Sequence, residues 1–192
     1  MAVVLRPSTG EVLAMSSMPT FDPNNPFEPY TEELKQKWDT LSKEEKSTEL
    51  NKMWRNKVIS DTQEPGSTFK IVTATAALEE HVTDLDKAGE FNCSGSMKIG
   101  TWTIKCWRYP RNHGSESLRQ GIMNSCNPVF MQVGQRIGID TYCKYLSAFK
   151  LDSKTGIDLP GEATGIMHDP KTMTAIDLAT TSFGQTIQIS TL

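Results

Sequence analysis

The feature that most constrains the fold is an apolar run that starts directly after a Pro-Gly pair. Residues 67–79 are rich in alanine, and Phe69, Val72 and Ala76 follow one another at three- and four-residue steps. That spacing places apolar side chains on one face of a helix. Pro65-Gly66 interrupts regular structure immediately before the run. The pattern predicts a buried helix over residues 67–79.

The first turn of this predicted helix carries Ser67 and, three residues later, Lys70. Such residues lie on one helix face, within reach of each other. A serine becomes a nucleophile when a base takes its proton, and a lysine can be that base where burial lowers its pKa. Backbone N–H groups at the helix start could form half of an oxyanion hole. A surface serine and lysine without shared function is the commoner origin of this spacing, and the Pro-Gly break and apolar helix argue against it.

A second candidate group, Ser125-Cys126-Asn127, opens an apolar segment predicted as a helix over residues 125–136. Pro128 suits the first turn of that helix, where the missing N–H has no cost. Serine and asparagine are also favoured helix caps, so a cap without chemical role is the alternative. Alone, the cap is the better interpretation; the pairing with the Ser67 motif favours a catalytic role.

The remaining sequence patterns predict short helices, strands and loops. Residues 31–57 carry seven basic and six acidic side chains, which predicts a solvated helix or helix pair held by i,i+4 ion pairs. The other expected elements are a hairpin over residues 2–16, an extended proline-rich loop over 18–26, short strands within 89–115, helices over 118–123, 141–149 and 172–181, and a loop over 156–165.

Composition limits the class of protein. The 192 residues carry a net charge of -3 and are 37% hydrophobic, which indicates a globular chain without the basic surface of a nucleic-acid-binding protein. No apolar run approaches the roughly 18 residues of a membrane span, and the apolar stretch in residues 1–7 is too short for a signal peptide. If the protein works outside the cytoplasm, its export or anchor signal is expected outside this chain.

Together these motifs resemble the transpeptidase domain of class B, monofunctional penicillin-binding proteins, and the resemblance covers residues 1–192. Within the family it points to the sporulation type or a close cell-wall elongation or division relative. It implies an α+β fold of the penicillin-binding and serine β-lactamase kind, with an antiparallel sheet flanked by helices and an all-helical subdomain. The segments that carry it are residues 4–15, 64–70, 124–130, 156–162 and 183–185.

The resemblance also implies roles for four side chains. Ser67 is the acylated nucleophile and Lys70 the general base, while Ser125 relays a proton and Asn127 positions the substrate amide. The implied reaction cross-links peptidoglycan stem peptides at D-Ala-D-Ala without a cofactor, and β-lactams acylate the same serine. The implied location is the extracytoplasmic face of the bacterial membrane, beside a membrane glycosyltransferase partner.

Lys154-Thr155-Gly156 spells the third motif of this family, but at the wrong place. It lies only 27 residues after Asn127 and before the 183–185 landmark, whereas the family carries this motif on a later strand. We therefore expect no catalytic role for Lys154. We also expect that the chain lacks the third motif and the last strands, leaving an incomplete sheet with an open edge and a poor catalyst.

Cys93, Cys106, His113 and Cys126 form a possible metal-binding set. Three thiolates and one imidazole suit a structural zinc ion, although the spacing is not that of a zinc knuckle. Some class B relatives resemble this arrangement, with a metal held by Asp, Cys and His. The alternatives are a Cys106–Cys126 disulfide, a redox switch by resemblance to sporulation-type relatives, and buried free thiols. The remaining cysteine and histidines are expected to be ordinary core or surface residues: Cys143, His81 and His168.

Two other functions share part of this pattern. A serine β-lactamase or β-lactam sensor has the same motifs but differs in deacylation, which in class A enzymes uses an extra activated water. The lifetime of the acyl-enzyme separates it from a transpeptidase. A non-catalytic scaffold for a membrane glycosyltransferase would not need the Ser67 hydroxyl.

Overall fold

The computed structural model describes residues 1–192, which form two compact units. Unit 1 comprises Met1–Thr62, Thr155–Ala163 and Ser190–Leu192, and unit 2 comprises Gln63–Lys154 and Thr164–Ile189. Strands occur as three separate two-stranded antiparallel sheets, two of them in unit 2. The mixture of helices and small antiparallel sheets agrees with the expected α+β class.

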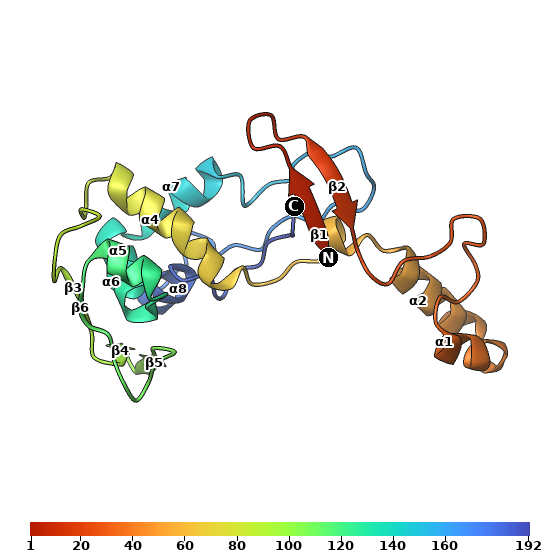
Figure 1. Cartoon of the computed structure of the whole chain (residues 1–192), viewed down its shortest axis with the longest axis horizontal. Helices are drawn as coiled ribbons and strands as arrows, with labels where there is room; N and C mark the ends of the chain where they lie inside the picture. Colours follow the sequence, from red (N-terminus) through yellow and green to blue (C-terminus); the bar gives the residue numbers. More distant parts are fainter. The chain divides into compact units, whose positions relative to one another are not determined.

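Unit 1 opens with the predicted hairpin. Strands β1 (Ala2–Leu5) and β2 (Val12–Ser16) pair antiparallel, with Ala2 opposite Ser16 (Figure 1). Gly10 has a φ of 75° in the connecting turn, a conformation that glycine adopts without steric cost. The proline-rich segment that follows the hairpin forms no helix or strand, as predicted.

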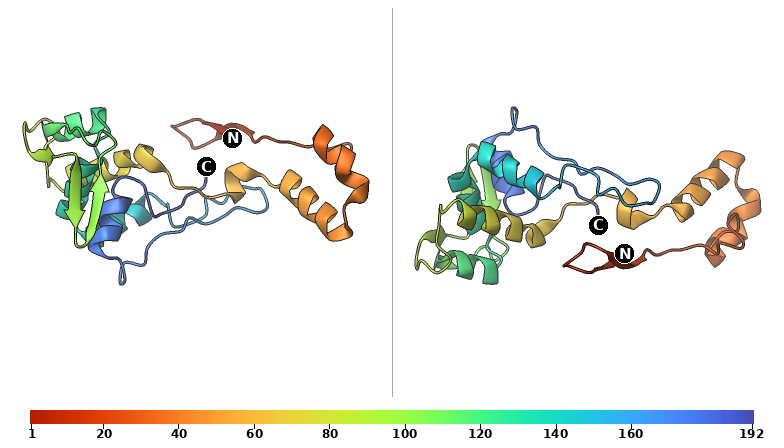
Figure 2. Two further views of the ribbon diagram at one scale, coloured as in Figure 1. Left: turned by 90° about the horizontal axis from the view of Figure 1, so that it is seen from below. Right: turned by 90° about the horizontal axis from the view of Figure 1, so that it is seen from above.

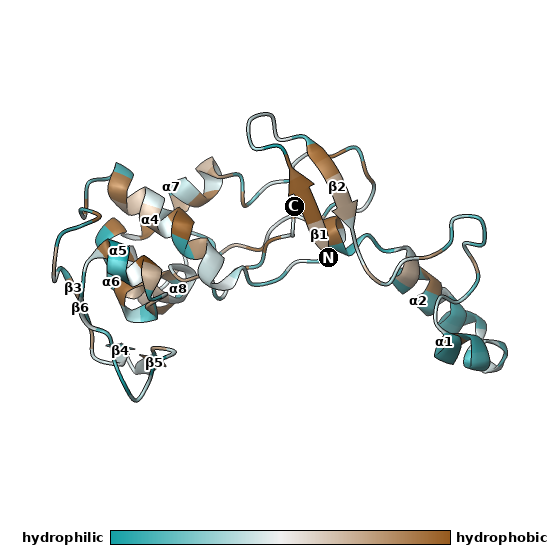
Figure 3. Cartoon of the chain, viewed as in Figure 1, coloured by the Kyte–Doolittle hydropathy of each residue, from teal (hydrophilic) through white to brown (hydrophobic).

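The charged segment of unit 1 is a helix pair, as predicted. It contains α1 (Glu32–Lys37) and α2 (Lys43–Trp54), followed by the short α3 (Lys57–Ser60). Figure 3 shows α1 and most of α2 in hydrophilic colours. The ion pairs Lys35–Glu32 and Lys52–Glu49 on these helices join residues three apart rather than the expected four. None of the helices in the structure combines the length and apolar character needed to cross a membrane.

Unit 2 holds both candidate motifs, the Ser67 motif and the Ser125 motif, and a hydrophobic core. Its central helix is α6 (Asn127–Ile137), which packs against each of the other four helices (Figures 1 and 2). Two glycines allow close packing: a Cβ on Gly121 would lie 2.5 Å from Val129, and one on Gly134 would lie 2.8 Å from Ser182. The other four helices are α4 (Lys70–Glu79), α5 (Leu118–Met123), α7 (Ile139–Ala148) and α8 (Ala175–Thr181).

Two short sheets complete unit 2. Strand β3 (Phe91–Cys93) pairs with β6 (Gly114–Glu116), and β4 (Ser96–Ile99) pairs with β5 (Trp102–Lys105). The β4–β5 hairpin therefore lies in sequence between two paired strands. This topology brings residues at both ends of the 93–114 segment together, since Cys93 is opposite Gly114.

Both helices that carry the candidate motifs begin later than predicted. The segment 67–79 opens as a 3₁₀ helix (Gly66–Phe69), and α4 starts only at Lys70. The helix predicted over 125–136 starts at Asn127. The buried face of α4 also differs from the prediction, because Thr73 is fully buried while Val72 is only partly so. The Thr73 hydroxyl tolerates this burial because it donates to the Ser182 carbonyl at 2.8 Å.

The backbone that precedes Ser67 is held by the last part of unit 2. Gln63 and Ile189 exchange two backbone hydrogen bonds of 2.9 and 3.0 Å. The Gly66 N–H donates to the Gly184 carbonyl at 2.9 Å. A Cβ on Gly184 would lie 2.0 Å from the Gly66 carbonyl oxygen, so only glycine permits this approach. The position of Ser67 therefore depends on Gly184.

We expect Gly184→Ala to destabilise the protein strongly. The variant meets both a φ of 84° and a backbone clash, so its free energy of unfolding should fall by more than about 3 kcal/mol. Gly138→Ala is the matched control, because Gly138 has a φ of 78° with nothing within 4 Å of its Cβ position. Gly138 has a ψ of 161°, so its loss should be about 1–3 kcal/mol, the cost of a conformation that favours glycine without a clash. Urea unfolding measures both, and equal losses would contradict the clash.

Candidate active site

The amine of Lys70 is the centre of a compact polar group. Its Nζ lies 3.2 Å from Ser67 Oγ, 3.0 Å from Ser125 Oγ and 2.7 Å from Asn127 Oδ1. The Ser125 carbonyl oxygen lies 2.8 Å away on the same nitrogen. The structure therefore brings together all four side chains for which the sequence predicts catalytic roles. They come from the first turns of α4 and α6 and the residues just before them.

Burial makes Lys70 unusual among lysines. The residue is 3% exposed, and its Nζ lies 5.4 Å from the centre of the Phe130 ring. Loss of water around the amine lowers its pKa from 10.5 to about 8, and Cys126 and Cys106 oppose this change weakly. A substantial fraction of the amine is then neutral near physiological pH. That is the form that can accept a proton.

The surrounding acceptors orient this amine. A neutral amine has two N–H donors and one lone pair. The two shortest contacts, to Asn127 Oδ1 and the Ser125 carbonyl, go to atoms that can only accept. Both N–H groups are thereby used, and the lone pair is left for the hydroxyls of Ser67 and Ser125. Ser67 itself is exposed and accessible to a substrate.

Ser125 does not cap the helix that follows it. The N-cap of α6 is Cys126, which makes no side-chain cap hydrogen bond, and Pro128 occupies the first turn as predicted. Ser125 instead has a φ of 49°, a left-handed conformation that is uncommon for residues other than glycine. This turn directs both its hydroxyl and its carbonyl to Lys70. The interpretation of the motif as a simple cap is wrong.

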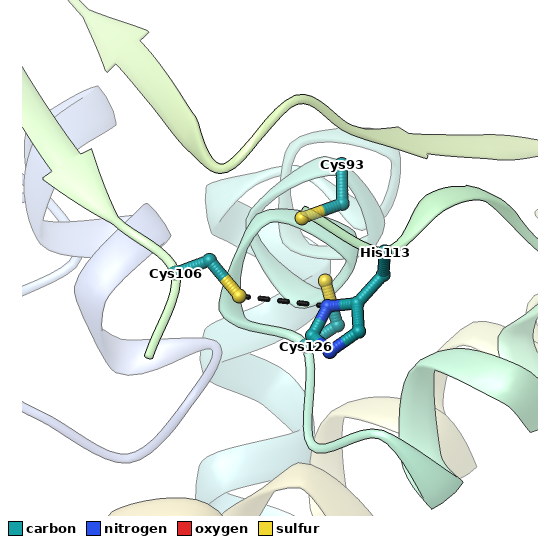
Figure 4. A group of neighbouring side chains, drawn as sticks. All are labelled: Cys93, Cys106, His113 and Cys126. Atoms are coloured by element: carbon teal, nitrogen blue, oxygen red, sulfur yellow. Dashed lines mark hydrogen bonds between the residues drawn. The ribbon is translucent and has the colours of Figure 1, made fainter. Parts of the chain in front are cut away.

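The four predicted metal ligands meet at one point (Figure 4). One ligand atom from each of Cys93, Cys106, His113 and Cys126 lies within 4.8 Å of all the others. The three cysteines are at most 2% exposed, and all are free thiols in this structure, without a Cys106–Cys126 disulfide. Cys106 Sγ lies 3.5 Å from His113 Nδ1. We call these four residues the Cys₃His cluster.

The cluster borders directly on the second motif, because Cys126 belongs to both. Burial raises the pKa of the Cys126 thiol well above its ordinary value, with the neighbouring Glu116 as a further cause. Burial likewise raises the pKa of the Cys106 thiol. Without a cation, these groups are therefore protonated thiols at neutral pH.

Glu116 is a site residue that sequence reasoning missed. It is 2% exposed, and its Oε1 accepts a 2.7 Å hydrogen bond from the Asn124 side chain. Its Oε2 is buried without a hydrogen-bond partner, 3.9 Å from His113 Nδ1. The available signal is an acidic residue in the short segment between His113 and the helix predicted from Leu118.

The remaining sequence candidates lie outside this group. Thr155 and Gly156 are in a loop, where both backbone N–H groups donate to the Glu162 carboxylate. Cys143 is buried in α7, as predicted, 3.7 Å from the Met173 sulfur. The two other histidines are exposed or partly so: His81 and His168.

The family model of the penicillin binding protein transpeptidase domain matches residues 1–192. The chain belongs to this family. Stage V sporulation protein D of Bacillus subtilis is 36% identical over 189 residues, 98% of this chain and 26% of that protein. Peptidoglycan D,D-transpeptidase PbpA of Mycobacterium tuberculosis is 34% identical over 155 residues, 79% of this chain and 30% of that protein. The chain thus spans about a quarter to a third of these relatives.

Solved structures agree on the fold. The transpeptidase domain of Burkholderia pseudomallei penicillin-binding protein 3, in its apo form, matches with a TM-score of 0.66 at 24% identity, over 71% of this chain and 40% of that one. Penicillin-binding protein 3 of Mycobacterium tuberculosis, complexed with aztreonam, matches with a TM-score of 0.65 at 27% identity, over 75% of this chain and 32% of that one. The expected transpeptidase fold is confirmed.

We expect the buried amine to make stability depend on pH. The pKa of Lys70 is about 8 in the folded chain and 10.5 when unfolded, so between these values the unfolded chain binds more protons. The free energy of unfolding should therefore fall as pH drops from about 10.5 to about 8, by about 3 kcal/mol in total. Urea unfolding of the wild type and Lys70→Met over this range isolates the effect, because other titrating groups are common to both. A difference that is constant with pH would contradict it.

Proposed function

We propose that residues 1–192 are the N-terminal part of one transpeptidase domain that forms an acyl-enzyme at Ser67 and cross-links peptidoglycan stem peptides. The observation that carries this proposal is the position of Lys70 Nζ within 3.2 Å of both serine hydroxyls and within 2.7 Å of Asn127 Oδ1. A nucleophile, a base of lowered pKa and an orienting amide are the parts that acyl transfer requires. The family of the chain supports the same reaction.

In the proposed acylation, neutral Lys70 takes the Ser67 proton as Oγ attacks the carbonyl carbon of the D-Ala-D-Ala bond. The C–N bond breaks, and the leaving D-Ala amine receives a proton through the Ser125 hydroxyl. The acceptor amine then attacks the ester carbonyl, the C–Oγ bond breaks, and the proton that the amine releases passes through the Lys70 amine to Ser67 Oγ. Asn127 holds the Lys70 amine and binds the substrate amide. No cofactor takes part in these steps.

The proposal extends to the setting of the reaction. Stem peptides are the substrates, and β-lactams acylate the same serine because their strained amide meets the same nucleophile. The site is placed at the extracytoplasmic face of the bacterial membrane, where peptidoglycan is assembled. A membrane glycosyltransferase is the expected partner, since it makes the glycan strands that a transpeptidase joins.

We expect benzylpenicillin to form a covalent adduct on Ser67. Intact-mass spectrometry followed by peptide mapping should locate the added mass on Ser67 and find none in Ser67→Ala. Thr68→Ala is the matched control, because Thr68 is the exposed neighbouring hydroxyl and bonds only to the Pro65 carbonyl. It should retain the adduct. The protein should be expressed with all residues that its gene encodes.

The same experiment separates the alternatives. An adduct that lasts for hours supports a penicillin-binding protein, and one lost far sooner supports a β-lactamase. An adduct of equal amount in Ser67→Ala would refute the assignment of the nucleophile. Full complementation of a deletion strain by Ser67→Ala would favour the scaffold function.

We further propose that the Cys₃His cluster holds a structural zinc ion. Three sulfurs and one imidazole nitrogen form the closed donor set that structural zinc prefers. The convergence of these four donor atoms, each within 4.8 Å of the others and with no disulfide among the cysteines, supports this fit. A zinc ion there would link the 93–114 segment to the start of α6.

We expect the purified protein to contain about one equivalent of zinc. Cys93→Ser should lose most of the metal, because one of four ligands is removed. Cys143→Ser is the control, since Cys143 is also a buried thiol but lies outside the cluster. Elemental analysis with thiol counting measures both. Less than about half an equivalent with four free thiols would reject zinc and disulfide alike.

A further inference from the structure

Asn124 is held from two sides by residues that have no predicted role. Its side-chain Nδ2 donates to Glu116 Oε1 at 2.7 Å. Its backbone carbonyl accepts from the indole Nε1 of Trp107 at 2.9 Å. One hydrogen bond fixes the side chain and the other fixes the backbone, so the orientation of the peptide that leads into Ser125 is determined by both.

Both of these residues are attached to the Cys₃His cluster. Trp107 directly follows Cys106, and its ring centre lies 5.6 Å from that of His113. Glu116 places its other carboxylate oxygen 3.9 Å from His113 Nδ1. A shift of the cluster therefore moves the two groups that hold Asn124.

Asn124 is in turn the immediate neighbour of the strained residue in the site. Ser125 has a φ of 49°, and such a conformation persists where the surroundings determine it. Through this turn, the Ser125 carbonyl and hydroxyl reach Lys70 Nζ at 2.8 and 3.0 Å. Asn124 thus connects the residues beside the cluster to the residue that contacts the amine of Lys70.

Trp107 is not placed by burial, because its residue is 66% exposed. Trp102, in the same hairpin segment, is 65% exposed and makes no comparable hydrogen bond to the second motif. The two tryptophans therefore form a matched pair that differs in the contact to Asn124. An exposed indole that points its N–H at a backbone carbonyl beside a catalytic serine indicates a positioning role.

We propose that Trp107 and Glu116 are positioning residues, which clamp Asn124 and so couple the state of the Cys₃His cluster to the geometry of Ser125 around Lys70. This inference rests on the proposed acylation of Ser67 for its functional meaning. The physical clamp itself does not require that reaction and is tested separately below.

The first test compares rates of Ser67 acylation by benzylpenicillin. Trp107→Phe should slow acylation about fivefold, the size expected for one hydrogen bond. Trp102→Phe should stay within about twofold of the wild type. Glu116→Ala should also slow acylation, and Glu116→Gln should restore it, because glutamine keeps the oxygen that accepts from Asn124. Equal rates in Trp107→Phe and Trp102→Phe would overturn the role of the indole.

The second test asks whether the cluster acts through the clamp. Cys93→Ser alters the cluster at a position far in sequence from Asn124, and it should slow acylation in the wild-type background. In a Trp107→Phe, Glu116→Ala background the same substitution should have a smaller effect, because the route through Asn124 is already broken and only the direct link through Cys126 remains. Fully multiplicative effects would overturn the coupling.

A spectroscopic test is independent of acylation. In ¹H–¹⁵N spectra, the Trp107 indole N–H should exchange with water more slowly than that of Trp102, and its resonance should move in Cys93→Ser. An indole that exchanges like Trp102 and is unaffected by Cys93→Ser would reject the clamp. Absence of acylation in the wild type, with these signatures present, would reject the proposed function and leave the clamp intact.

Discussion

The candidate active site in unit 2 depends on the burial of one lysine amine, that of Lys70. Lys70 loses nearly all of its water and receives in exchange four polar contacts, from Ser67, from Asn127 and twice from Ser125. Burial alone would favour the neutral amine but leave its direction free. The acceptors fix that direction, so the same arrangement that makes the lysine a base also aims it.

The sequence predicts which residues form the site around Lys70, but it does not predict how all of them are oriented. The spacing of Ser67 and Lys70 is local, so helical periodicity is sufficient to place them together. Ser125 and Asn127 were found by their motif, but the left-handed turn at Ser125 was not predicted, because no local preference of serine favours it. The turn results from packing of the residues on either side, with Cys126 in the core and Asn124 held at the surface.

Tertiary contacts account for the other differences between prediction and structure. The helix over 67–79 was predicted correctly as buried, yet its first turn is 3₁₀ because Gly66 is bonded to Gly184, over a hundred residues later. The cluster ligands were predicted because cysteine and histidine carry recognisable chemistry. Glu116 carries equally relevant chemistry but is a common residue type, and only its burial and its partnerless oxygen distinguish it.

The backbone hydrogen bond between Gly66 and Gly184 affects when the Ser67 site can form during synthesis of the chain. A ribosome delivers the nucleophile segment early, while residues 184–189, which fix the backbone ahead of Ser67, emerge last in this stretch. Contacts of such long sequence separation form late, because a long loop must close first. A growing chain therefore presents Ser67 on an unanchored segment until synthesis has passed residue 189, and the nucleophile becomes aligned only when its unit is complete.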